Sequence, residues 1–198
     1  MREAQQSHLF EILCVLVDKG VQFVVAGGAA VVLHGIQRLT LDLDIAVSPE
    51  QTNLRRFIST LNLLKFVPRA PVPAETILNR ERLETIIREK NALVFTFWSP
   101  GDPYKQIDMF LTRENSFDDL VSDARTLKVL GRTVLVASRQ KLIEMKRKVE
   151  PIRDQDLSDI QALQIIERTA QNSDSAIMAV DPSMHAKRKS RSDELIAG

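Results

Sequence analysis

Three aspartates, placed in two stretches that resemble β-strands, could together hold a divalent cation. Asp42 and Asp44 are separated by one residue, so on a strand their carboxylates point to the same side, about 7 Å apart along the backbone. Two such anions about 5 Å apart repel by about 3 kcal/mol at an effective dielectric of 20, and a divalent cation removes that repulsion. Hard carboxylate oxygens suit Mg²⁺. A solvent-facing strand could also carry this pair, so the pair alone fits both interpretations.

The third aspartate, Asp108, lies in a later apolar stretch. Ile107, Met109 and Leu111 alternate with it, which places Asp108 on the opposite face together with Gln106. Aspartate is depleted in strands, so three of them in two predicted strands call for a reason. If the two strands are neighbours, all three carboxylates can meet; otherwise Asp108 is a solvent-facing side chain.

A glycine pair, Gly27-Gly28, interrupts an apolar run and precedes a short helical pattern. Glycine lets a backbone approach a phosphate closely, and the N–H groups at the start of a helix attract anions. The alternative is a tight turn with no ligand, which is the more frequent use of such a pair.

The periodicity of apolar residues predicts the elements that must position these groups. Helices are expected over residues 7–19, 29–33, 50–64, 76–90, 116–123, 138–149 and 153–169. Strands are expected over residues 21–26, 41–47, 92–98, 104–111, 126–130 and 133–136. The prolines within 66–74 predict a loop there.

These elements predict one α/β (α+β) domain with a mixed β-sheet flanked by helices. Its expected extent is 1–170, with a core over 20–137 and C-terminal helices over 138–170. Asn, Ser, Asp and Pro dominate 171–198, which we expect to be a disordered tail with a solvated basic cluster at 187–191.

Composition excludes several classes of protein. The 198 residues carry a formal net charge of +1, so net charge gives no argument for a nucleic-acid coat protein. The single cysteine, Cys14, excludes an intramolecular disulfide framework and a multi-cysteine zinc site. The apolar stretch 9–17 is too short to span a bilayer, and we expect a cytoplasmic protein with no membrane partner.

The order of these motifs resembles the signature of the minimal nucleotidyltransferase superfamily, which has the polymerase-beta-like fold. The matching letters are AGGA at 26–29, LHG at 33–35 and RLTLDLDI at 38–45, and Asp108 matches the third carboxylate of that family. Residues 138–160 look like the C-terminal helical motif of bacterial abortive-infection nucleotidyltransferases, the toxin-like branch.

This resemblance implies Mg²⁺- or Mn²⁺-dependent transfer of a nucleoside monophosphate from a nucleoside triphosphate to a hydroxyl of a tRNA or a protein. It also implies a toxin of a toxin–antitoxin system, with a cognate antitoxin as partner. It assigns metal binding and catalysis to Asp42, Asp44 and Asp108, and nucleotide binding to Gly27, Gly28, Arg38, Thr40 and Lys146.

The chain departs from the family at Gly28, where a serine is frequent, so a side-chain hydroxyl is missing from the turn. That departure leaves open a catalytically silent protein that binds a nucleotide or a partner. A third hypothesis is a small-molecule nucleotidyltransferase similar to antibiotic-adenylating enzymes. For Lys146, the alternative to phosphate binding is a structural ion-pair network with Arg153, Asp156 and Asp159. His34 is expected to be structural.

Overall fold

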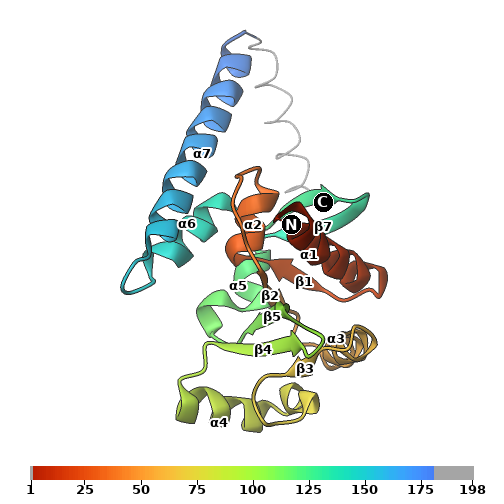
Figure 1. Cartoon of the computed structure of the whole chain (residues 1–198). Coiled ribbons are helices and arrows are strands. Elements are labelled where there is room, and N and C mark those ends of the chain that lie inside the picture. Colours follow the sequence, from red (N-terminus) through yellow and green to blue (C-terminus); the bar gives the residue numbers. More distant parts are fainter. Residues whose placement is uncertain (1, 181–198) are drawn as a thin grey trace, which may run out of the picture.

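The computed structural model describes residues 2–180 as a mixed β-sheet surrounded by helices (Figure 1). The strands are β1 (Phe23–Val25), β2 (Asp42–Val47), β3 (Val67–Pro68), β4 (Val94–Ser99), β5 (Asp102–Phe110), β6 (Arg125–Val129) and β7 (Arg132–Val136). The α-helices are α1 (Arg2–Asp18), α2 (Gly27–Leu33), α3 (Gln51–Leu63), α4 (Arg80–Lys90), α5 (Phe117–Val121), α6 (Arg139–Arg147) and α7 (Asp154–Val180). Two short 3₁₀ helices are η1 (Ala74–Leu78) and η2 (Arg113–Asn115).

The seven strands form one sheet in the order β3-β4-β5-β2-β1-β7-β6. The central strand β2 pairs antiparallel with β1 and parallel with β5. The hairpins β4–β5 and β6–β7 extend the sheet on either side of this centre. The fold therefore places β2 and β5 side by side although about sixty residues separate them in the chain.

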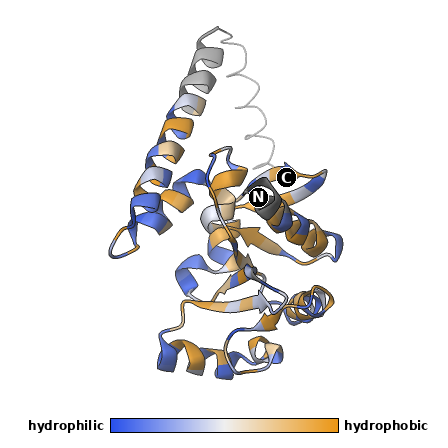
Figure 2. Cartoon of the chain, in the orientation of Figure 1, coloured by the Kyte–Doolittle hydropathy of each residue, from blue (hydrophilic) through white to orange (hydrophobic). Residues whose placement is uncertain are grey.

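The core lies between the sheet and its helices because the inward positions of each strand are apolar. Leu43 and Ile45 of β2 and Ile107 of β5 are fully buried. Phe57 of α3 meets Phe97 of β4 edge to face, with ring centroids 5.7 Å apart. Hydrophobic residues accordingly concentrate in the central strands (Figure 2).

The predicted mixed sheet with flanking and C-terminal helices is confirmed, with local differences. The first helix begins at Arg2 rather than at residue 7, and the helix predicted over 76–90 is divided into η1 and α4. The predicted proline loop over 66–74 contains the two-residue strand β3, and η1 begins at its end. Pro68 is tolerated in β3 because this strand lies at the edge of the sheet, where a missing N–H costs no ladder bond.

The last helix, α7, continues to Val180, so it extends into the stretch from residue 171 that was predicted to be a tail. Neither glycine nor proline occurs between Asp154 and Val180, so the sequence holds no strong helix breaker there. The rest of the predicted tail, with its basic cluster at 187–191, lies outside the described residues. Within 2–180, none of the helices is long and apolar enough to cross a membrane.

Candidate active site

The two aspartates of β2 lie on one face of the sheet because the strand alternates. Leu43 and Ile45 point into the core, so Asp42 and Asp44 point to the opposite side. The apolar partners hold this register, since a slip by one residue would bury both carboxylates in the core.

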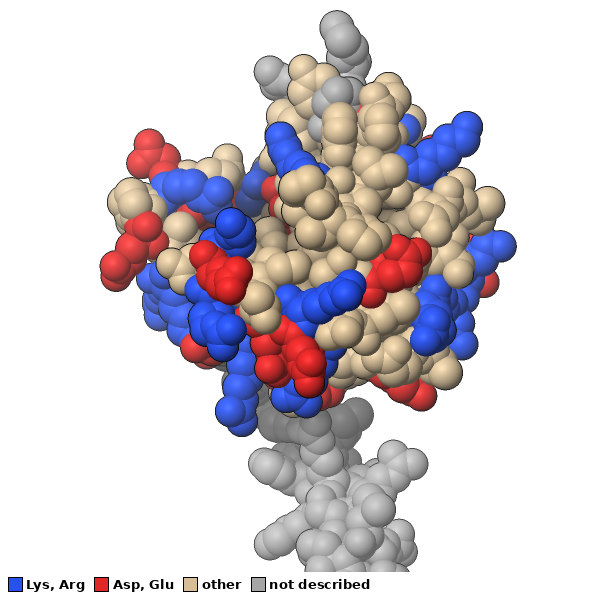
Figure 3. All heavy atoms as spheres, turned by 90° about the horizontal axis from the view of Figure 1, so that it is seen from below, with Lys and Arg blue, Asp and Glu red and all other residues tan. Residues whose placement is uncertain are grey.

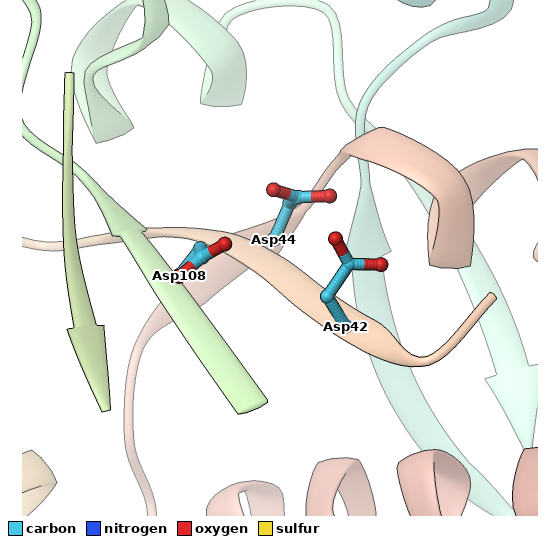
Figure 4. Close-up of side chains that lie close together, drawn as sticks. All are labelled: Asp42, Asp44 and Asp108. Carbon is cyan, nitrogen blue, oxygen red and sulfur yellow. The ribbon is translucent and has the colours of Figure 1, made fainter. Parts of the chain in front are cut away.

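Pairing between β2 and β5 brings the third aspartate to the same place. Asp44 lies directly opposite Asp108 in the parallel register. One carboxylate oxygen from each of Asp42, Asp44 and Asp108 lies within 4.8 Å of the others. All three side chains stand on the same side of the two strands (Figure 4). The predicted meeting of the three carboxylates is therefore present in the structure.

Hydrogen bonds hold the carboxylate of Asp108, which is 9% exposed. Thr96 Oγ1 on β4 donates to Asp108 Oδ1 at 2.7 Å, and Gln106 Nε2 donates to Oδ2 at 3.0 Å. Gln106 Oε1 in turn accepts from Arg69 Nη1 at 2.9 Å. Sequence analysis identified Gln106 only as a residue on the face of Asp108. Thr96 and Arg69 carried no signal, because their positions depend on the pairing of β4 with β5.

Burial is the first cause that raises the pKa of the Asp44 carboxyl to about 7, followed by the negative charges of Asp42 and Asp108. A hydrogen bond from the Gly28 backbone and the positive charge of Lys146 act in the opposite direction without cancelling the shift. The Gly28 N–H and Lys146 are thus too weak to offset the burial of Asp44 and the negative charge of its two neighbours.

The glycine turn packs directly against this carboxylate. Gly27 has a φ of +56°, and a Cβ on it would lie 1.8 Å from Asp44 Oδ2. A side chain at this position is therefore excluded twice, by the backbone conformation and by the carboxylate.

Gly27→Ala is expected to lower any activity that depends on Asp44 by about a hundredfold, because the methyl group must displace the carboxylate by more than 1 Å. Activity and thermal unfolding should be compared with Gly101→Ala, since a Cβ on Gly101 meets no atom within 4 Å. Unchanged activity in Gly27→Ala would show that Asp44 need not lie against the turn.

Lys146 on α6 lies in a buried ion-pair network. Its Nζ is 2.8 Å from Asp156 Oδ1 and 2.7 Å from Asp159 Oδ2, and both aspartate side chains are 1% exposed. Arg153 Nε also pairs with Asp156 at 2.6 Å. The structural network predicted for these residues is present, and it ties α6 to α7. Lys146 as a nucleotide-binding residue stays a prediction.

Arg38 and Thr40 occupy the segment that leads into β2. Arg38 Nη1 pairs with Asp159 on α7, and Thr40 Oγ1 donates to Asp42 Oδ1 at 3.1 Å. Both residues help to line a pocket of about 410 Å³ beside Asp42, with Tyr104 and Gln106 on its other side. His34 Nε2 lies 2.8 Å from the backbone oxygen of Ala137, which fits its predicted structural role.

The chain resembles solved structures of nucleotidyltransferases, whereas no family model and no curated protein sequence matches it. It is 17% identical to a lincomycin-bound crystal structure of the lincosamide antibiotic adenylyltransferase LnuA, covering 81% of this chain and 96% of that one with a TM-score of 0.53. The solution structure of the antibiotic-resistance factor ANT(2'')-Ia is 12% identical, with 90% and 97% covered and a TM-score of 0.51.

A nucleotidyltransferase-like protein from Paracoccidioides brasiliensis, described as antigenic, is 13% identical. That match covers 92% of this chain and 90% of that one, with a TM-score of 0.52. Together with the acidic group on β2 and β5, these likenesses show that the chain has the nucleotidyltransferase fold, the polymerase-beta-like fold.

Proposed function

We propose that this protein is a Mg²⁺-dependent nucleotidyltransferase that moves a nucleoside monophosphate from a nucleoside triphosphate to a hydroxyl of a small molecule. The hydroxyl oxygen bonds to the α-phosphorus, and the bond between the α- and β-phosphates breaks to release pyrophosphate. The observation that carries this proposal is the group of three carboxylates from two strands, within 4.8 Å of one another and against a glycine turn. The fold supports the same reaction class.

The donor set fits a hard divalent cation. Asp42, Asp44 and Asp108 offer oxygen ligands, and their mutual repulsion contributes to the raised pKa of Asp44. The positive charge of Lys146 does not neutralise these three carboxylates, because Lys146 is paired with Asp156 and Asp159. When bound, Mg²⁺ or Mn²⁺ supplies charge neutralisation for the phosphoryl group in transfer.

The chain itself positions the two reactants. The backbone N–H groups of the turn at Gly27 and Gly28 bind the triphosphate. The pocket lined by Arg38, Thr40 and their neighbours receives another part of the nucleotide. The Asp108 carboxylate, fixed by its two hydrogen bonds, orients the acceptor hydroxyl and accepts its proton. Most of the rate enhancement then comes from positioning and electrostatics.

A small-molecule acceptor is favoured over a tRNA or a protein. LnuA is solved with lincomycin, and ANT(2'')-Ia with adenylyl-2''-tobramycin at 11% identity and a TM-score of 0.50. On the face shown in Figure 3, basic and acidic side chains are interspersed, so this face offers no cluster of basic charge for a tRNA backbone. The toxin interpretation and a cognate antitoxin have no support from these structures.

The test is a transfer assay with each of the four α-labelled nucleoside triphosphates and Mg²⁺. Acceptors should include hydroxylated small molecules, among them lincosamides and aminoglycosides, and in parallel total RNA and a cell lysate. We expect label on a small molecule, and no transfer by the double variant Asp42→Ala/Asp44→Ala. Glu89→Gln, a change of an exposed carboxylate on α4, should transfer as the wild type does.

Two results would contradict the proposal in different ways. Transfer that survives in Asp42→Ala/Asp44→Ala would remove the assigned site. Label found on RNA or on a protein, and on no small molecule, would keep the reaction but overturn the acceptor class.

A further inference from the structure

The volume above Gly28 is filled by side chains from another segment. Gly28 is absent from the glycines with positive φ, so its backbone would accept a side chain. A Cβ on Gly28 would nevertheless lie 2.5 Å from Thr40 Oγ1 and 2.9 Å from Arg38 Nη2. Both obstacles are side-chain atoms. The glycine at position 28 is therefore dictated by what residues 38 and 40 place there.

Thr40 is held in this position by its burial and by a hydrogen bond to Asp42. Its side chain is 4% exposed, and its hydroxyl donates to Asp42 Oδ1 at 3.1 Å. Arg38, beside it, is anchored by Asp159 of α7, a side chain that is 1% exposed. The hydroxyl of Thr40 thus lies between the glycine turn and one of the three carboxylates.

We propose that Thr40 is a positioning residue for Asp42, and that its hydroxyl takes the place of a side chain on the glycine turn. Positions 28 and 40 then have room for only one hydroxyl between them. The bond to Oδ1 restricts rotation of the Asp42 carboxylate, and Oδ2 takes no part in that bond. This inference rests on the proposed function in one respect, the binding of a divalent cation by Asp42.

The first experiment measures Mn²⁺ binding to the full chain by electron paramagnetic resonance, without nucleotide. Loss of a hydrogen bond to a metal ligand costs about tenfold to a hundredfold in metal affinity, so Thr40→Val should bind Mn²⁺ weaker by about that factor. Thr40→Ser keeps the hydroxyl and should bind within about threefold of the wild type, on the same reasoning.

A matched control separates this effect from the general loss of a threonine hydroxyl. Thr85 Oγ1 on α4 donates to the Glu81 backbone oxygen, far along the chain from the three carboxylates. Thr85→Val should leave Mn²⁺ affinity unchanged. If Thr40→Val binds Mn²⁺ as the wild type does, the positioning role is overturned.

The second experiment tests whether a side chain at position 28 and the Thr40 hydroxyl compete for the same volume. Gly28→Ser alone should weaken Mn²⁺ binding, because its Cβ displaces the Thr40 hydroxyl. Adding Thr40→Ala removes the nearer of the two obstacles and leaves only the end of the long Arg38 side chain to move aside. The serine introduced at position 28 then supplies the hydroxyl from the turn, so the double variant should bind more tightly than either single variant. A double variant no better than the weaker single one would refute the exchange. This comparison of Mn²⁺ affinities tests the role of the Thr40 hydroxyl even if Thr40→Val fails to fold.

Mn²⁺ binding by the wild type separates a failure of the proposed function from a failure of the role of Thr40. A wild-type chain that binds no Mn²⁺, or that binds it as well after Asp42→Ala/Asp44→Ala, contradicts the proposed function. A wild type that loses Mn²⁺ binding in that double variant but not in Thr40→Val contradicts only the role of Thr40.

Discussion

Asp44→Asn is expected to stabilise the metal-free protein at pH 8 by about 4 kcal/mol while it lowers transfer by at least about a hundredfold. The stabilisation follows from the raised pKa of the buried Asp44 carboxyl, about 7 in the folded chain against 3.8 for an unperturbed group. An asparagine at this position keeps the shape and carries no charge. The loss of transfer follows because one of three cation ligands disappears.

The pH dependence has a definite sign. Between pH 4 and 7 the folded state holds a proton on Asp44 that the unfolded chain has released. The contribution of Asp44 to stability is therefore most favourable below about pH 4 and is lost as the pH rises to about 7. The Asp44→Asn variant lacks this loss. Its advantage over the wild type should therefore be small at pH 4 and complete above pH 7.

Urea unfolding at several pH values in the presence of a chelator measures this difference. Added Mg²⁺ should raise the melting temperature of the wild type at pH 8 and leave that of Asp44→Asn nearly unchanged. Glu89→Gln serves as the control for loss of an exposed carboxylate on α4. A variant that is less stable than the wild type at pH 8 would mean that burial and the neighbouring carboxylates do not raise the pKa of Asp44.

The sequence was sufficient to predict the acidic group because its geometry follows from strand periodicity. Alternation placed Asp42 and Asp44 on one face and Asp108 on the polar face of its own strand. The step that periodicity could not supply was the pairing of β2 with β5, which the resemblance to a known family implied and the register confirms. The glycine turn was predictable for the same reason, as a break between a strand and a helix.

The residues that hydrogen-bond to the carboxylates could not be predicted from the sequence. Thr96 meets Asp108 only because of the hairpin register, and Arg69 reaches Gln106 from the segment after β3. The extent of α7 does not follow from composition, because the polar residues after 170 are typical of a disordered segment, although no helix breaker interrupts the helix before Val180. Contacts between distant segments depend on packing, and local patterns carry no record of them.

Lys146→Met is expected to destabilise the protein by about 3 kcal/mol, because it removes a charged hydrogen-bond donor that two buried carboxylates share. The side chain of Lys146 is 8% exposed, and those of Asp156 and Asp159 are 1% exposed. Methionine fills a similar volume but leaves Asp156 with Arg153 alone and Asp159 with Arg38. Urea unfolding at pH 7 measures the effect.

Lys141→Met is the matched control, since Lys141 pairs with Asp119 at 2.8 Å in a more exposed setting, where loss of the pair should cost less than about 1 kcal/mol. If Lys146→Met unfolds like the wild type and instead raises only the KM for the nucleoside triphosphate, Lys146 serves the nucleotide. In that case the network holds without it, and the phosphate-binding prediction replaces the structural one.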